Sequence, residues 1–176
     1  MIAAMTRAVH AGVTPFEEVY RDHADAVFRF CVSQLRDQAA AEDVTGDVFA
    51  AAFAAYERVR PEPDGVRTWL FRIARNAVID QYRREGRRRS LLSRIGHSRE
   101  FPSTVEETAE VRNDLRSVCA AIESLHERDR QLVGLRVAAG LSYAEVATVV
   151  NMREGAARMA THRALEHVRA TLRAEA

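Results

Sequence analysis

Eight arginines gather between Arg67 and Arg89, in the stretch RTWLFRIARNAVIDQYRREGRRR, and only two acids accompany them. The formal net charge of the whole chain is +1, so this positive charge is local. Guanidinium groups match the geometry of phosphate oxygens and base edges, and each phosphate contact releases counterions. The stretch is therefore a candidate nucleic-acid site, with a solvated helix face as the alternative interpretation.

A helix is predicted to carry these arginines. Apolar side chains at helical spacing give it a packing face, so the arginines are expected at the rim or in solvent. The members of that face are Trp69, Leu70, Ile73, Ala77 and Val78. The preceding stretch RPEPDG, residues 60–65, has two prolines and a glycine and predicts a loop.

Two further helices are predicted before this loop. The first begins at Thr14 with a helix-capping residue, a proline and two acids in the order typical of a helix start. The second, AAAEDVTGDVFAAAFAAYERV, is acidic at its start and amphipathic. Its inward side chains are predicted to be Val44, Val48, Phe49, Ala52, Phe53 and Tyr56.

The helical pattern dissolves between residues 86 and 111, and an interdomain linker is predicted there. Helices return over residues 113–125 and 128–140, with Gly140 in the position of a helix C-cap. Ser142 and Glu145 then form an S-x-x-E capping box that opens a short helix. A turn at Asn151 and Met152 leads into a longer last helix, which predicts a helix-turn-helix.

The predicted fold class is all-α, with two small helical domains joined by a flexible linker. The expected division is a tail over residues 1–13, a first domain over 14–85, the linker over 86–111 and a second domain over 112–176. There is no long apolar run, so membrane insertion is not expected. We find no metal-ligand spacing, phosphate loop or nucleophile motif, and so expect no metal, no cofactor and no enzymatic activity.

The stretches AEDVTGDVFAAAFAAYERVR and RTWLFRIARNAVIDQYRRE resemble the first conserved domain of the extracytoplasmic-function (ECF) sigma factors. LHERDRQLVGLRVAAGLSYAEVATVVNMREGAARMATHRALEHVR is similar to their second domain, and the likeness runs from about Thr14 to Arg173. The resemblance implies a cytoplasmic protein that binds core RNA polymerase and directs it to promoters.

In the family the first domain holds an unpaired base of the promoter −10 element. The resemblance places this role on the loop formed by Pro61, Glu62, Pro63, Asp64, Gly65 and Val66. On the following helix it implies base contacts from Arg75, Asn76 and Asp80, and backbone contacts from Arg72, Arg83 and Arg84. A basic track with polar groups suits a melted strand, whereas Trp69 is expected to pack in the core.

The last helix is implied to enter the major groove of the −35 element. The candidate contacts in this domain are Ser142, Tyr143, Arg153, Glu154, Arg158, His162 and Arg163. This chain departs from the family pattern at Ala156, Ala157, Met159, Ala160 and Thr161. Because an arginine is usual at the position of Ala160, we expect an altered or weaker −35 preference.

The family also implies several partners. Asp43, Asp47, Val48 and Phe49 match the surface that grips the clamp coiled coil of the largest polymerase subunit, although Gly46 and Asp47 replace the usual Gln-Glu. Further expected partners are the flap region of the polymerase, promoter DNA and an anti-sigma factor. The acids Glu106, Glu107 and Glu110 in the linker either mimic nucleic acid or are simply solvated.

A conventional helix-turn-helix regulator that acts without core polymerase is the alternative function. It would explain the second domain only, and it is expected to bind spaced half-sites as a dimer. Promoter recognition as a sigma factor accounts for both domains, the linker and the alternation of acidic and basic segments. Sequence reasoning therefore favours the sigma factor.

Overall fold

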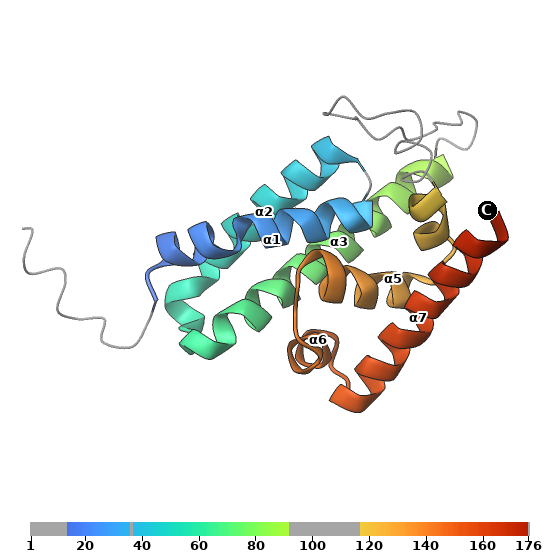
Figure 1. Ribbon diagram of the computed structural model, residues 1–176. Helices are drawn as coiled ribbons and strands as arrows, with labels where there is room; N and C mark the ends of the chain where they lie inside the picture. Colours follow the sequence, from blue (N-terminus) through green and yellow to red (C-terminus); the bar gives the residue numbers. More distant parts are fainter. Residues whose placement is uncertain (1–13, 36, 92–116, 176) are drawn as a thin grey trace, which may run out of the picture.

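The computed structural model describes residues 14–35, 37–91 and 117–175, and every regular element in these ranges is a helix (Figure 1). The predicted all-α fold is therefore confirmed. The expected N-terminal tail, the acids Glu106, Glu107 and Glu110 and most of the expected linker lie outside the described residues.

Three long helices form the N-terminal half of the fold. They are α1 (Phe16–Leu35), α2 (Gln38–Val59) and α3 (Val66–Leu91), with a short 3-10 turn, η1 (Pro63–Gly65), before α3. The side chain of Asp37 caps α2 by accepting a hydrogen bond from the Ala40 backbone N–H at 2.9 Å. Phe30 of α1 and Phe71 of α3 meet edge to face in the core, with ring centroids 5.9 Å apart.

Two details of these helices differ from expectation. Phe53 was predicted to face inward but is 66% exposed, because it lies 100° around α2 from the buried Ala52 and so falls beside the apolar stripe. The helix α3 continues to Leu91, past Gly86, where the pattern was expected to dissolve. One glycine in a helix costs only about 1 kcal/mol relative to alanine, which is too little to end a helix by itself.

The buried face of α3 is shifted by one residue from the predicted one. Leu70, Phe71, Ala74 and Val78 are fully buried. Trp69, Ile73 and Ala77 lie at the flank and pack against this core, and the Trp69 ring is 5.8 Å from that of Tyr56. Trp69 therefore packs as predicted, and the exposed side of α3 carries Arg72, Arg83 and Arg84.

The C-terminal half has a helical segment at residues 117–123, α5 (Glu127–Val133), a π-helical turn η2 (Gly134–Ala138), α6 (Tyr143–Val150) and α7 (Glu154–Glu175). Gly140 adopts a φ of 68°, as a C-cap requires. The capping box is confirmed: Ser142 Oγ accepts from the Glu145 N–H, and Glu145 Oε2 accepts from the Ser142 N–H at 2.7 Å. Asn151, with φ 55°, makes the turn between α6 and α7.

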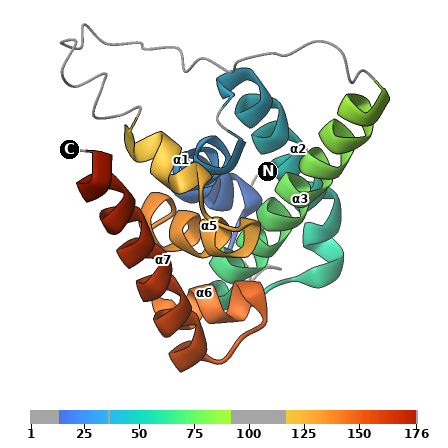
Figure 2. The ribbon, with the colours of Figure 1, turned by 90° about the vertical axis from the view of Figure 1, so that its right-hand side faces the viewer.

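The two halves share one hydrophobic core. Leu135, Leu141 and Val146 from the C-terminal half belong to the same buried cluster as Phe30 and Leu70. Figures 1 and 2 show α5 and α6 lying between α3 on one side and α7 on the other. The basic helix α3 therefore faces the helix-turn-helix directly.

Candidate nucleic-acid interface

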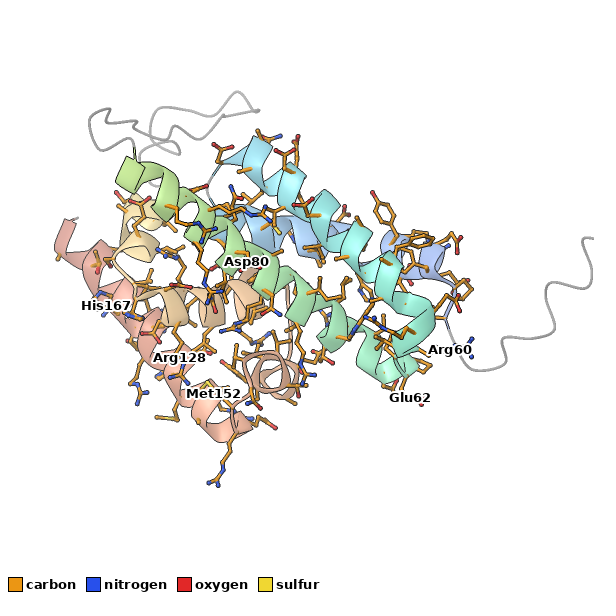
Figure 3. The ribbon with its side chains drawn as sticks, turned by 180° about the vertical axis from the view of Figure 1, so that it is seen from behind. Arg60, Glu62, Asp80, Arg128, Met152 and His167 are labelled. Carbon is orange, nitrogen blue, oxygen red and sulfur yellow. The ribbon has the colours of Figure 1, made fainter. Side chains whose placement is uncertain are left out.

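The loop expected to hold an unpaired base lies at the start of α3. Glu62, Pro63 and Asp64 are exposed, whereas Pro61 and Val66 are buried and anchor the loop. Figure 3 shows Glu62 beside Arg60 at one end of the molecule, away from Asp80. The exposed tip therefore consists of the two acids and one proline, with Gly65 half-buried behind it.

One exposed face of α3 carries most of the predicted −10 contacts. Its residues recur at intervals of three or four, which places them on one side of a helix. They are Arg72, Asn76, Asp80, Arg83 and Arg84, all exposed. At 1.5 Å per residue this strip is about 18 Å long, room for several nucleotides of an extended strand. Asp80 also holds Arg83, with Arg83 Nη1 3.3 Å from Asp80 Oδ1.

Two of the predicted −10 arginines bind the C-terminal half of the same chain. Arg72 donates from Nε and Nη2 to the Thr148 carbonyl oxygen, at 3.2 and 3.0 Å. Arg75, which is half-buried, donates from Nε to Gln131 Oε1 at 2.8 Å. Their guanidinium groups are thus already engaged by α6 and α5.

Arg67 makes the third such contact and was missed by sequence reasoning. Its Nη1 lies 3.2 Å from Glu145 Oε1 in an ion pair, and its Nη2 donates to the carbonyl oxygens of Ala139 and Gly140 at 2.9 and 3.1 Å. The residues joined are 78 positions apart, so no local pattern signals the pair. The only sequence signal for a role of Arg67 was the high arginine content of residues 67–89.

The electrostatics around this contact perturb two groups. Partial burial alone would raise the pKa of Glu145, but hydrogen bonds from Ser142 and the Arg67 guanidinium hold that pKa below its usual range. Burial lowers the pKa of His23, and Arg67 lowers it further against the opposite effects of Asp22 and Glu145. His23 is half-buried next to the Arg67–Glu145 pair.

The residues expected to contact the −35 element are accessible. Ser142, Arg153, Glu154, His162 and Arg163 are exposed. Arg158 is exposed as well, and its Nη2 lies 2.7 Å from Glu154 Oε1. Tyr143 is half-buried under two guanidinium groups, those of Arg136 at 5.0 Å and Arg158 at 5.3 Å from its ring centroid. The start of α7 thus presents a polar, cationic outer surface.

The unusual residues of α7 divide between its two faces. Ala156 and Met159 are exposed, whereas Ala157, Ala160 and Thr161 are buried. Thr161 Oγ1 donates to the Ala157 carbonyl oxygen at 2.8 Å. Because Ala160 is 9% exposed, the position where the family usually has arginine is turned toward the core in this arrangement. Met159 is the larger of the two exposed departures, with 55% of its surface exposed.

The residues expected to grip the polymerase clamp also divide. Asp43 and Asp47 are exposed on α2, whereas Val48 is fully buried and Phe49 is 6% exposed. Phe49 supports the exposed Tyr20, whose ring centroid is 4.7 Å away. Together with Phe53, which packs on Phe16 at 5.2 Å, this makes an exposed aromatic surface on α1 and α2. The sequence pattern missed Phe53 here because it assigned that side chain to the core.

Metal and membrane sites were searched over the residues with described positions. No group of three or more His, Cys, Asp or Glu side chains gathers there in a way that would hold a metal ion. No helix within those ranges is long and apolar enough to cross a membrane.

Comparison with known families gives two matches that fall on the two halves of the fold. Residues 19–88 match Sigma-70 region 2, and residues 115–168 match Sigma-70 region 4. The first match includes the acidic part of α2 and the basic face of α3, and the second includes the helix-turn-helix.

Curated relatives extend the similarity along nearly the whole chain. The ECF RNA polymerase sigma factor SigE of Mycolicibacterium smegmatis is 30% identical over 162 residues, which are 90% of this chain and 62% of SigE. SigL of Mycobacterium tuberculosis is 26% identical over 171 residues, 97% of this chain and 96% of SigL.

Solved structures share the fold. The sigma factor RpoE from Bartonella quintana, in complex with the anti-sigma factor NepR, superimposes with a TM-score of 0.73 at 22% identity, over 90% of this chain and 96% of RpoE. CnrH, in complex with the cytosolic domain of CnrY, gives 0.68 at 25% identity over 92% and 89% of the two chains. With both conserved regions present in order and similarity to ECF sigma factors along 90% or more of its length, the chain belongs to the ECF sigma factors of bacterial RNA polymerase.

Proposed function

We propose that this protein directs core RNA polymerase to its own set of promoters, with α3 holding the opened −10 strand and α7 reading the −35 duplex. The observation that carries the proposal is the presence of two different exposed, arginine-bearing surfaces in one chain. The strip on α3 has the arginines, amide and carboxylate suited to an unpaired strand. The outer face of α7 has the cationic surface suited to a major groove.

On α3 the roles divide by side-chain chemistry. Asn76 and Asp80 are exposed one helical turn apart and offer the donors and acceptors that an extruded base edge needs. Arg72, Arg83 and Arg84 lie on the same face and bind the phosphates, while Arg75 lies next to it. The loop tip at Glu62, Pro63 and Asp64 approaches the flipped base at the start of the helix.

Three arginines in α7 or directly before it supply charge to the phosphates or to guanine edges. They are Arg153, Arg158 and Arg163. Glu154 and His162 are accessible for base edges, and Ser142 and Tyr143 line the approach to the backbone. The exposed Met159 gives this surface an apolar contact for a thymine methyl group.

The acidic, aromatic surface of α2 and α1 is the proposed polymerase contact. Asp43 and Asp47, exposed on α2, supply charge for the clamp coiled coil, and the exposed Tyr20 and Phe53 supply apolar area on α1 and α2. Val48 and Phe49 are buried beneath this surface, where their packing supports the exposed side chains. The C-terminal half would contact the flap region, and the protein would act in the cytoplasm, where polymerase and promoters are. We include an anti-sigma factor among its partners because the similar RpoE and CnrH chains were solved with protein partners.

Run-off transcription on a pool of genomic promoter fragments, with purified core polymerase and with or without this protein, tests the proposal. We expect transcripts that start downstream of a shared two-part motif only when the protein is present. DNA binding by a dimer in the absence of polymerase, with no such transcripts, would favour the conventional regulator instead.

A further inference from the structure

The tyrosine that opens α6 contacts two arginines from different elements. The centroid of the Tyr143 ring lies 5.0 Å from the guanidinium carbon of Arg136, in the π-helical turn η2, and 5.3 Å from that of Arg158, in α7. Both distances are shorter than the limit of about 6 Å within which a guanidinium group is attracted to an aromatic face. Arg158 and Tyr143 were expected to contact the −35 element, whereas no role was expected for Arg136. The three side chains form one unit at the start of the helix-turn-helix.

The inner part of this unit is fixed by its own contacts. Arg136 is half-buried, and its Nη1 donates to the Leu141 carbonyl oxygen at 3.0 Å. Tyr143 is also half-buried and directly follows Ser142, whose capping box holds the first turn of α6. The Tyr143 ring is therefore presented to α7 in a defined position.

The outer part of the unit is Arg158, which is exposed and makes two contacts within the chain. Its Nη2 lies 2.7 Å from Glu154 Oε1, one turn earlier in α7, and its guanidinium group faces the Tyr143 ring. An acid four residues before a basic residue is the favourable order for such a pair in a helix. An exposed arginine otherwise samples many rotamers. Two contacts on one guanidinium group give Arg158 a preferred orientation before DNA binds.

We propose that Tyr143 is a positioning residue for Arg158. Its ring, with Arg136 packed against it, holds the Arg158 guanidinium group ready for one base pair of the −35 element and so sets the preference at that pair. A binding group that is already ordered loses less entropy when it binds. The paired contact of arginine to O6 and N7 of guanine depends on orientation, so the base pair concerned is expected to be G·C. The inference rests on the proposed function, because it concerns the −35 contact assigned there to α7.

Two other roles for Tyr143 make different predictions. A tyrosine hydroxyl that donates to a DNA phosphate would act without regard to base identity, and its effect would be lost in Tyr143→Phe. A ring that keeps Arg158 away from DNA would oppose base recognition, so removing the ring would strengthen the preference. Positioning predicts a weaker preference without the ring and an unchanged one without the hydroxyl.

The contact between the ring and Arg158 is tested in the free, full-length chain by NMR. An aromatic ring shifts the signals of protons that lie over its face, so the δ protons of Arg158 are expected upfield of those of the exposed Arg169. This shift should persist in Tyr143→Phe and disappear in Tyr143→Leu. Circular dichroism checks that both variants are as helical as the parent chain. An Arg158 signal at the position of Arg169 in the parent chain would overturn the proposal.

The consequence for base preference is tested with a holoenzyme formed from core polymerase and either the parent chain or a variant. Run-off transcription is compared between a promoter with its own −35 motif and templates in which one base pair of that motif is replaced. In Tyr143→Leu the preference at one G·C pair should fall about two- to fivefold, the effect of losing one exposed cation–π contact. The preference at the other pairs should be kept. Tyr143→Phe should behave as the parent chain, because it retains the ring.

A double-mutant cycle decides whether the ring acts through Arg158. In an Arg158→Ala background, Tyr143→Leu should cause no further loss of preference, since the group that the ring positions is absent. Arg169→Ala is the matched control. It removes the same charge from another exposed ion pair of α7, that with Glu166, and should leave the base preference unchanged.

Three results would overturn the proposal. They are an equal effect of Tyr143→Leu with and without Arg158, a loss in Tyr143→Phe as large as that in Tyr143→Leu, and a stronger preference when the ring is removed. Absence of promoter-specific transcripts with the parent chain would contradict the proposed function instead. The NMR measurement needs neither polymerase nor DNA, so it would still decide whether the ring holds Arg158.

Discussion

At the scale of single residues, neighbouring positions on α2 have different work to do. Asp47 is exposed and available to a partner, whereas Val48 is fully buried against the core. Both match the clamp-binding pattern of the family, and the difference between them becomes visible only when each side chain is placed. We therefore expect Asp47 to take part in the proposed polymerase contact and Val48 to support it.

Replacing these neighbours should separate binding from stability. Asp47→Ala is expected to weaken binding to core polymerase while changing the free energy of unfolding by less than about 0.5 kcal/mol, as exposed positions usually do. Val48→Ala removes two buried carbons and should lower the free energy of unfolding by about 1–2 kcal/mol. Urea denaturation and a polymerase pull-down check both. Equal loss of stability in the two variants would contradict this division.

Cys31 offers a second test at this scale. Burial raises the pKa of its thiol to about 11, so almost no thiolate exists at pH 8, and the thiolate is the reactive form. We expect Cys31 to stay unmodified by iodoacetamide in the folded chain and to react after unfolding, as read by mass spectrometry. Rapid alkylation of Cys31 under native conditions would show that its helix face is open.

At the scale of elements, helix α2 is less stable than it could be because of one glycine. Gly46 lies in the middle of this helix, is exposed, and has open space where a Cβ would be. An alanine there restricts the unfolded chain and fits the folded one.

Gly46→Ala is therefore expected to raise the free energy of unfolding by up to about 1 kcal/mol. Thermal or urea denaturation measures the change. Gly134→Ala, which introduces the same side chain where Gln34 is in the way, serves as the contrasting variant and should show no such gain. A destabilised Gly46→Ala would mean that the glycine is needed for a conformation other than this helix.

At the scale of the whole molecule, the packing of the two halves around His23 makes the stability of the fold sensitive to pH. The pKa of His23 is lowered by burial and by Arg67, while Asp22 and Glu145 act in the opposite direction. The folded chain therefore binds fewer protons at this site than the unfolded chain, in which the pKa returns to its ordinary value near 6.5. Its stability is lost as the pH falls through that value.

Acidification from pH 7.5 to pH 5.5 should thus lower the free energy of unfolding measured by urea denaturation, and His23→Gln should remove most of the dependence in this range. Glu145, whose pKa lies below its usual range, keeps its charge there and contributes only at lower pH. An equal loss of stability in the parent and in His23→Gln would assign the effect to other groups.

The sequence allowed the local features of the fold to be predicted, but not the contacts between residues far apart in the chain. The helices, the capping box at Ser142 and the C-cap at Gly140 follow from neighbours a few residues apart, where physical rules are strong. The exposure of Phe53 depended on the angle at which α2 lies on the core. The engagement of Arg72, Arg75 and Arg67 depended on residues more than 50 positions away, for which one sequence carries no signal.

The most direct test of the central claim, that the exposed face of α3 holds the opened promoter strand, is permanganate footprinting of unpaired thymines. It uses a promoter identified by run-off transcription, core polymerase and either the parent chain or the double variant Asn76→Ala, Asp80→Ala. We predict reactive thymines at the −10 element with the parent chain, and their loss with the variant while polymerase binding is retained. Thymine reactivity that survives the double substitution would contradict the assignment of this face to the melted strand.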